Sequence, residues 1–276
     1  MIEEIYAMEM QQRFIDDVTR AVETDARVLA AWLEGSYGRG DADRFSDVDL
    51  HLLLAPAAAD DFRADAEEWL GALRPLVLYR LMFDGAMINA LDEEGLRLDI
   101  WLHVGEQAAI EPARAQVLFA RGDVLRDKSP AAPPDPAALA AKLDGQIREF
   151  WRCIALVPVV AGREEHLVGF MGLNVEQGIL VNVLLDGYGI ARDAGVKKLN
   201  PFLPAELRHA LEAALTMSDL STRSLVTAHL ALAKIMQAHG PIIAARHEFA
   251  YPQALEQSVL AYVDQELATL GLAART

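Results

Sequence analysis

The chain has 276 residues, of which 53% are hydrophobic and 24% charged, so it is too apolar for a disordered protein and long enough for one large domain or two ordinary ones. Its formal net charge is −16, which disfavours nonspecific nucleic-acid binding because such binding needs clustered Lys and Arg side chains. The same charge would suit a cationic partner, although many soluble proteins are acidic for solubility alone.

The compartment is indicated by the cysteine content and by the first residues. A single cysteine, Cys153, excludes an intramolecular disulfide and is typical of a reducing cytoplasm. Residues 1–17 are acidic and amphipathic, without the basic start and apolar core of a signal peptide. No apolar run approaches the roughly 20 residues that a membrane helix needs. We therefore expect a soluble, cytoplasmic protein with no membrane association.

The first elements alternate between helix and strand. Apolar residues at near-helical spacing predict a helix over residues 3–24. Bounded apolar runs predict strands at 28–34 and 48–54, joined by a turn and a short helix over 35–46. Residues 57–74 predict another helix, which ends at a proline.

The segment that joins the first two strands carries the polar chemistry. Asp47 and Asp49 lie two positions apart at the second strand, so both carboxylates project from the same face. Two like charges this close need a compensating cation, and Mg²⁺ with carboxylate and phosphate ligands is the natural one. Gly35 lets the backbone approach a phosphate, and Ser36 adds a hydroxyl donor. The segment therefore predicts a binding site for a metal ion and a triphosphate.

Three further strands are predicted, at 77–83, 87–91 and 96–104, the first two forming a hairpin around an Asp-Gly pair. Asp99 is a lone carboxylate in the third of them, so it must be paired, bind a metal or lie at the rim of a cleft. The alternative is an outward-facing residue on an edge strand. Glu106, just beyond, is a weaker candidate for a general base.

The element order predicts an α+β fold, with a mixed sheet that has helices on one face, followed by an all-α helical bundle. Residues 115–128 predict a strand or hairpin. Proline-rich residues 130–136 predict a stiff linker, which gives domains at 1–132 and 137–276. Helical spacing of apolar residues predicts five helices over 139–157, 164–186, 204–217, 218–239 and 252–272.

Polar residues of the second domain are candidates for substrate contacts. Glu176 lies in an otherwise apolar helix and is predicted to contact a cationic acceptor at the domain junction; a hydrogen-bonded helix face is an equally good interpretation. Arg148 and Arg152 share one helical face. They would reach the triphosphate or pair with nearby acidic residues.

The motif as a whole resembles the nucleotidyltransferases of the DNA polymerase beta superfamily, and its small-molecule branch, the kanamycin, streptomycin and lincosamide nucleotidyltransferases, looks closest. The residues that carry the resemblance are Gly35, Ser36, Arg39, Gly40, Ser46, Asp47 and Asp49. One departure is Asp43, where many relatives have a basic residue. That leaves Arg39 and Arg44 to supply positive charge in this loop.

The resemblance implies an enzyme that transfers a nucleoside monophosphate from a nucleoside triphosphate, ATP by preference, to a hydroxyl of a small molecule and releases pyrophosphate. It implies two Mg²⁺ ions on Asp47, Asp49 and Asp99, with Asp99 also acting as the general base. It further implies that Gly35, Ser36, Ser46 and Arg39 or Arg44 hold the nucleotide. The acceptor would be an aminoglycoside or lincosamide antibiotic, with resistance as the role, and a homodimer is compatible with this interpretation.

Three other interpretations remain. One is an antitoxin-type enzyme that nucleotidylates a protein, although those are usually minimal domains without a helical bundle. Another is a catalytically silent nucleotide-binding member, against which the three carboxylates argue. Arg223 and His229 also match the loose Arg-His spacing of HEPN ribonuclease toxins, which arises readily by chance.

Overall fold

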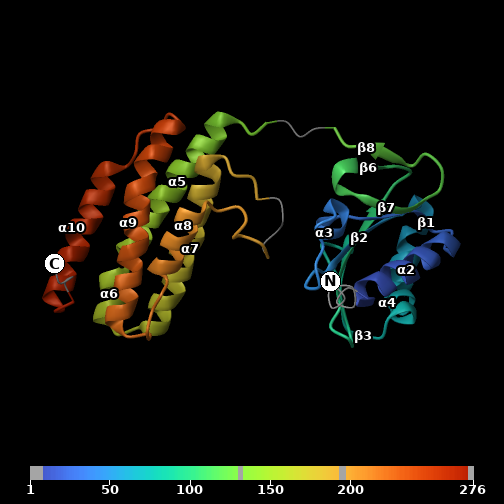
Figure 1. Ribbon diagram of the computed structural model, residues 1–276, viewed down its shortest axis with the longest axis horizontal. Coiled ribbons are helices and arrows are strands. Elements are labelled where there is room, and N and C mark those ends of the chain that lie inside the picture. Colours follow the sequence, from blue (N-terminus) through green and yellow to red (C-terminus); the bar gives the residue numbers. More distant parts are fainter. Residues whose placement is uncertain (1–8, 130–132, 193–196, 273–276) are drawn as a thin grey trace. The chain divides into compact units, whose positions relative to one another are not determined.

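The computed structural model describes residues 9–129, 133–192 and 197–272 (Figure 1). The chain divides into two compact units, Met1–Ala131 and Ala132–Thr276. The first combines a mixed sheet with helices and the second is helical, which confirms the predicted α+β class.

Unit 1 is built on a six-stranded sheet with the order β3-β4-β5-β2-β1-β7. The two central strands, β2 and β5, are parallel, and the other neighbours are antiparallel. The strands span Val28–Leu33 (β1), Val48–Leu54 (β2), Leu76–Met82 (β3), Met87–Asp92 (β4), Arg97–Val104 (β5) and Gln116–Ala120 (β7).

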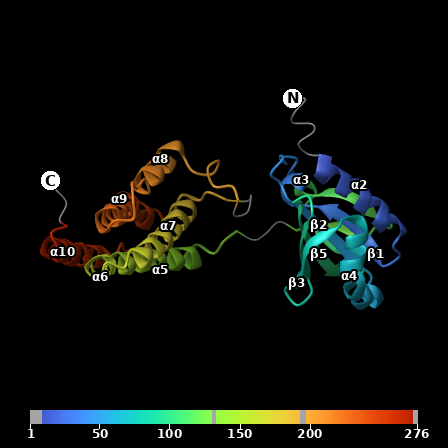
Figure 2. The same ribbon diagram turned by 90° about the horizontal axis from the view of Figure 1, so that it is seen from below.

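Two helices cover one face of this sheet. Figure 2 shows α2 (Glu9–Thr24) and α4 (Ala59–Leu73) on the same side of the strands. Phe14 of α2 and Phe62 of α4 are fully buried there, against Leu50 and Leu52 of β2. Since side chains alternate along a strand, the odd-numbered residues of β2, which include Asp49, face the other way.

The second face of the sheet is partly covered by the segment that follows β5. That segment contains β6 (Ala108–Ile110) and β8 (Leu125–Asp127), which pair in parallel, and the short 3₁₀ helix η2 (Pro112–Arg114); a similar turn, η1 (Pro56–Ala58), precedes α4. A small core of Ala30, Trp32, Leu53 and Ile110 lies beneath it. Residues 115–128 were expected to form a strand or a hairpin. They contain the strands β7 and β8, but not as a hairpin, because β7 pairs with β1 while β8 pairs with β6.

In its described residues, unit 2 has six helices around one apolar core. They are α5 (Pro136–Ile154), α6 (Val157–Gly162), α7 (His166–Tyr188), α8 (Ala205–Ala214), α9 (Thr222–Arg246) and α10 (Gln253–Thr269). We expected five. The sixth is α6, a separate short helix with Pro158 in its first turn, a position that suits proline because its nitrogen has no hydrogen to donate. Helix α9 also runs past Pro241, beyond its predicted end at residue 239.

Helix α7 corrects the expectation that no segment has the length and composition of a membrane span. Among the described residues it is the one helix that does, with 23 residues and a mean hydropathy of 1.4 over its most apolar window. Length and composition alone are weak evidence for a span, because the core helix of a soluble protein has the same features. Leu180, Val183 and Leu184 of α7 are fully buried in the bundle core.

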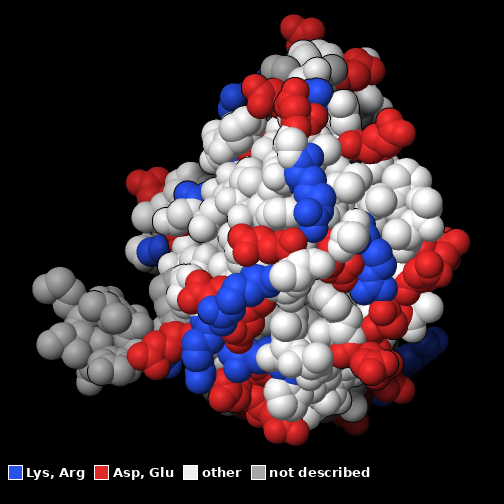
Figure 3. Space-filling view, turned by 90° about the vertical axis from the view of Figure 1, so that its right-hand side faces the viewer, with Lys and Arg blue, Asp and Glu red and all other residues white. Residues whose placement is uncertain are grey.

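Charged residues of both signs lie side by side on the molecular surface. On the face shown in Figure 3, Lys and Arg side chains are interspersed among Asp and Glu. On this face, the acids that give the chain its net charge of −16 are therefore interrupted by bases.

Candidate active site

Three carboxylates meet at the boundary of the two central strands. Asp49 lies directly opposite Asp99 in the parallel register of β2 and β5, and Asp47 immediately precedes β2. One ligand oxygen from each of the three lies within 4.8 Å of the others. Asp47 is only 8% exposed. The three aspartates that the sequence singled out are thus brought together in space, and their oxygen donors fit a hard divalent cation such as Mg²⁺.

The turn after β1 lies against this carboxylate cluster. It opens the short helix α3 (Gly35–Arg39), whose first residue has a positive φ of 60°. A Cβ atom on Gly35 would lie 1.8 Å from Asp49 Oδ2, which no side chain tolerates. The backbone N–H of Glu34 donates to the Asp49 carbonyl at 3.0 Å and ties the turn to β2. Glycine is therefore required here to bring the backbone against an acidic side chain.

Helix α3 is held from its other side as well. A Cβ on Gly38 would lie 2.1 Å from the Arg114 carbonyl oxygen of η2, so helix and loop backbones are in direct contact. Ser36, in the first turn of α3, is buried with 9% of its surface exposed. Both predicted contacts for a triphosphate, the Gly35 backbone and the Ser36 hydroxyl, thus belong to a turn packed on both sides.

The loop from α3 to β2 holds the remaining predicted phosphate contacts. Arg39 forms an ion pair with Asp41 at 3.1 Å, and the Arg44 guanidinium lies 4.5 Å from the centre of the Phe45 ring. Ser46 Oγ accepts from the Asp43 N–H at 2.9 Å. The Ser46 hydroxyl therefore closes this loop, and the phosphate contact that the resemblance implies for it stays a prediction.

Two supporting residues were missed by the sequence reasoning. Asn89 of β4 lies opposite Asp99, and its Nδ2 donates to Asp99 Oδ1 at 2.7 Å. Gln11 of α2 is 1% exposed, and its Nε2 donates to the carbonyls of Arg44 and Ser46, at 3.3 Å each. A polar residue at an inward position of an apolar helix or strand was the available signal in both cases.

A row of stacked rings continues from the carboxylates along the same face of the sheet. His51 and His103 share a hydrogen bond of 2.9 Å between ring nitrogens, and the Trp32 indole stacks on both. Burial lowers the pKa of His51 to about 4. The charge of Glu34 opposes this shift, and His103 adds to it. Burial also lowers the pKa of His103. Both rings are therefore neutral near pH 7.

Glu176, the predicted acceptor contact in unit 2, lies in the interior of that unit. Glu176 is 1% exposed, and its Oε2 lies 2.6 Å from Nδ1 of His229, which is 2% exposed. Burial raises the pKa of Glu176, while His229 acts against that rise. The side chain is thus a buried partner of His229 in this structure, which is a correction to its expected place on an acceptor-facing surface. Burial of His229 also speaks against the ribonuclease interpretation, which needs an accessible histidine.

The two arginines of α5 pair with nearby acidic residues, which is one of the two interpretations given for them. Arg148 pairs with Asp144 at 2.8 Å, and Arg152 pairs with Glu149 at 2.6 Å. Glu106 of unit 1 is exposed after β5.

Comparisons with known proteins place the site within a known type of domain. Residues 15–115 match the family model described as "Nucleotidyltransferase domain". No curated protein sequence matches the chain.

Among solved structures, an aminoglycoside 6-adenyltransferase from Bacillus subtilis is similar at 13% identity, with a TM-score of 0.45 and coverage of 92% of this chain and 96% of that one. A nucleotidyltransferase-like protein from Exiguobacterium sibiricum is similar at 10% identity, with a TM-score of 0.36 and coverage of 95% and 92%. The CdnE cyclic dinucleotide synthase from Elizabethkingia meningoseptica, solved with GTP and Apcpp, is similar at 13% identity, with a TM-score of 0.28 and coverage of 94% and 92%. At these scores the likenesses carry no argument about substrate, which has to come from the site.

Proposed function

We propose that the protein transfers a nucleoside monophosphate from a nucleoside triphosphate to a hydroxyl of a small molecule, on the basis that residues 15–115 match the nucleotidyltransferase domain model. The observation that supports it most directly is the convergence of Asp47, Asp49 and Asp99 within 4.8 Å beside the Gly35 turn. Two parallel strands and a packed turn hold that arrangement, so it does not depend on a flexible loop.

The three aspartates would hold Mg²⁺, with two ions as the proposed number. When bound, the metal supplies positive charge to the phosphate oxygens and to the attacking and leaving oxygens. Carboxylates within 4.8 Å of one another repel, so a site that needs such a cation explains their proximity.

The residues of the chain provide positioning and proton transfer. The Gly35 turn and Ser36 bind the β- and γ-phosphates through backbone N–H groups and a hydroxyl. Asn89 donates to one oxygen of Asp99 at 2.7 Å and so orients the other toward the acceptor. Asp99 takes the proton of the acceptor hydroxyl while the oxygen of that hydroxyl forms its bond to the α-phosphorus. The bond between that phosphorus and the bridging oxygen breaks, and pyrophosphate leaves on the opposite side.

The acceptor is a small hydroxylated molecule that carries positive charge, and an aminoglycoside or lincosamide is the class we propose. The net charge of −16 and the acidic site favour a cation over an anion at this position. ATP is the proposed nucleotide, the cytoplasm the proposed compartment and antibiotic resistance the proposed role.

Release of pyrophosphate tests the proposal. Wild-type protein is incubated with Mg²⁺, each of the four nucleoside triphosphates and a panel of aminoglycosides and lincosamides. We expect turnover that stops when the metal is chelated, and a loss of at least about 10³-fold for Asp47→Asn because this change removes charge stabilisation at the reacting phosphate.

The matched control is Asp61→Asn, an exposed acid in the first turn of α4. It should retain wild-type turnover. Undiminished turnover by a folded Asp47→Asn protein would rule out the proposed site.

A further inference from the structure

The face of the sheet that carries the carboxylates continues into aromatic side chains. Trp101 follows Asp99 by two positions on β5, so its ring stands on the same face about 7 Å further along the strand. It is partly exposed and stacks on His51 of β2, with ring centres 6.3 Å apart. On its other side lies Phe83, 5.7 Å away and inclined by only 7°. We call Trp101 and Phe83 the aromatic surface.

Phe83 is held in a conformation that a bulky residue rarely adopts. It lies in the turn between β3 and β4 with a φ of 53°, and its side chain is 62% exposed. A left-handed backbone costs a large side chain free energy, and an exposed ring recovers little of it through burial. Asn or Gly would suit this turn better. Such strain, offset only by the stacking of a largely exposed ring on Trp101, points to a functional constraint.

The turn is fixed by contacts from outside the hairpin. The Leu102 N–H of β5 donates to the Ala86 carbonyl at 2.8 Å, and Arg63 Nε of α4 donates to the Gly85 carbonyl at 3.2 Å. Phe83 is therefore presented beside Trp101 by an anchored turn.

The direction of the reaction places the acceptor over this part of the sheet. The Gly35 turn follows β1, and in the strand order β5, β4 and β3 lie on the opposite side of β2 from β1. The attacking and leaving oxygens of a phosphoryl transfer are roughly in line. If pyrophosphate leaves toward the Gly35 turn, the acceptor hydroxyl attacks from the side of β5, next to Asp99 and the aromatic surface. This step rests on the proposed function.

We propose that the aromatic surface binds the acceptor, and that the acceptor is a hydroxylated ring bearing protonated amines. Aromatic faces attract cations, Trp most strongly, and they pack well against the C–H face of a saturated ring. The carboxylate of Asp99 lies two residues from Trp101, and Asp84 is exposed next to Phe83. Aromatic rings flanked by carboxylates recognise an amino-substituted ring better than a neutral or acidic one.

The experiment measures binding constants by calorimetry on the full-length chain, for two sets of ligands. The first set is inorganic tripolyphosphate and a nonhydrolysable ATP analogue, each with Mg²⁺. The second set is kanamycin, streptomycin, spectinomycin and lincomycin as probes, added to protein already loaded with the analogue and Mg²⁺. The variants are Phe83→Asn and Trp101→Phe, with Val77→Ala, 60% exposed on β3, as the control.

We expect at least one amino-substituted probe to bind the wild type and to bind Phe83→Asn about fivefold to tenfold more weakly. Trp101→Phe, which keeps a ring, should lose about threefold. Both variants should bind the ATP analogue as the wild type does. Because Asn suits a positive φ, the melting temperature of Phe83→Asn should be at or above that of the wild type, which separates lost binding from lost structure.

Three results would overturn the proposal. In the first, no amino-substituted probe binds although the ATP analogue does. In the second, a probe binds but both variants retain full affinity for it. In the third, Phe83→Asn weakens the ATP analogue but not tripolyphosphate, which would assign the aromatic surface to the nucleobase. Failure of the proposed function itself looks different, because the wild type would then bind neither tripolyphosphate nor the analogue.

Discussion

Gly35 lies so close to Asp49 that a side chain at this position would displace the Asp49 carboxylate. Its missing Cβ would lie 1.8 Å from Asp49 Oδ2 and 2.7 Å from Asp49 Cγ, and its φ of 60° is a conformation that residues with a side chain rarely adopt. We predict that Gly35→Ala lowers kcat of nucleotide transfer by at least about 100-fold, because a displacement of about 1 Å at reacting groups costs this much. Pyrophosphate release under saturating Mg²⁺ and nucleotide is the measurement.

A second glycine provides the control for this substitution. Gly71 lies in α4 with open space where its Cβ would be, so Gly71→Ala should leave kcat unchanged. It should also stabilise unit 1 by about 0.5–1 kcal/mol, since alanine favours a helix interior. Equal activity of the two variants would mean that the Gly35 turn does not contribute to the reaction.

Single residues also show what a sequence reveals about a site and what it conceals. The shared face of Asp47 and Asp49 can be predicted from the sequence, because strand geometry puts positions two apart on one face. That Asp49 faces Asp99 depends on the parallel register of two strands almost fifty residues apart in sequence, which periodicity does not determine. Asn89 escaped attention for the same reason, since its partner is set by register across β4 and β5.

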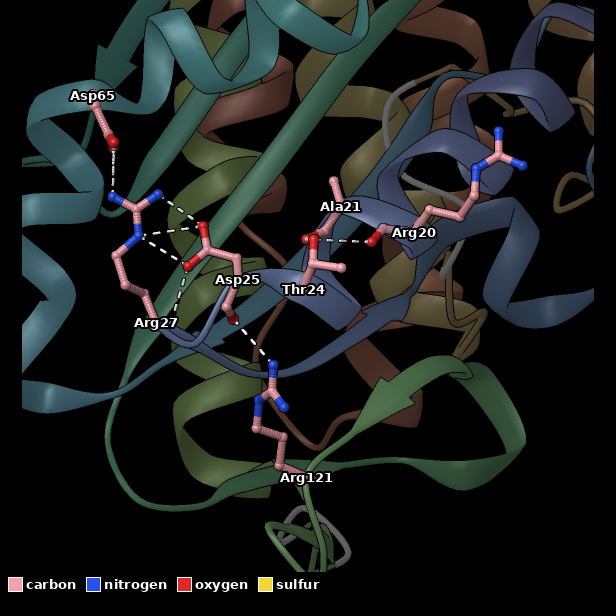
Figure 4. Close-up of polar contacts among 7 residues, drawn as sticks. All are labelled: Arg20, Ala21, Thr24, Asp25, Arg27, Asp65 and Arg121. Atoms are coloured by element: carbon pink, nitrogen blue, oxygen red, sulfur yellow. Dashed lines mark hydrogen bonds and ion pairs between the residues drawn. The ribbon is translucent and has the colours of Figure 1, made fainter.

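Among the elements, the junction between α2 and β1 is held by charge as well as by packing. Figure 4 shows Asp25 and Asp65 on either side of the Arg27 guanidinium. Arg27 Nη2 lies 2.7 Å from Asp25 Oδ2, and Arg27 Nη1 lies 2.7 Å from Asp65 Oδ2. Arg121, after β7, donates to the Asp25 carbonyl at 3.3 Å. The end of α2 is thereby linked to β1, α4 and the segment after β7.

This junction predicts a pH-dependent stability for unit 1. The Arg27 side chain, bonded to Asp25, holds the pKa of that carboxyl below its usual 3.8, against an opposing effect of burial. A depressed folded-state pKa gives stability that is present above the unfolded-state pKa and is lost as pH falls through the folded one. Asp25→Asn should therefore destabilise unit 1 by about 1–2 kcal/mol at pH 7, in keeping with a partly buried, charged hydrogen bond.

Urea unfolding of the two proteins at pH 7 and again near pH 3 checks the prediction. The difference in free energy of unfolding should shrink at the lower pH, where the wild-type carboxyl begins to take up its proton. A difference that stays constant between these pH values would show that Asp25 acts through something other than its charge.

The elements that the sequence predicted poorly are those decided by partners distant in the chain. β2 was predicted at its observed bounds because apolar residues at every second position, from Val48 to Leu54, are typical of a strand with one face in the core. By contrast, whether β7 pairs with β8 or with β1 is decided by which sheet edge is open, and local pattern does not contain that information. Helix α9 continues past Pro241 because the bundle buries residues beyond it, such as Ile243, and such packing outweighs a local helix breaker.

At the scale of the whole molecule, each unit buries a core of its own. The cores of unit 1 and unit 2 share no residue among those described: the two apolar clusters of unit 1 contain residues up to Ile110, and the cluster of unit 2 begins at Leu143. Separate cores are what allow two units to unfold as separate cooperative transitions. The sequence indicated such a division through its proline-rich segment, while the composition of each core followed from helical and strand periodicity.

We predict that calorimetry of the full chain gives two transitions that single substitutions move independently. Glu176→Ala leaves His229 buried without its 2.6 Å partner, which should destabilise unit 2 by about 3 kcal/mol. For a unit of this size that lowers one melting temperature by roughly 10 °C. Gly71→Ala should raise the other melting temperature by roughly 2 °C and leave the first unchanged, because the buried residues of α4 belong to the core of unit 1. A double variant should show both shifts at once, as expected for changes that share no contacts. A single transition that both substitutions displace would instead mean that the two cores unfold together, and that the units are thermodynamically one body.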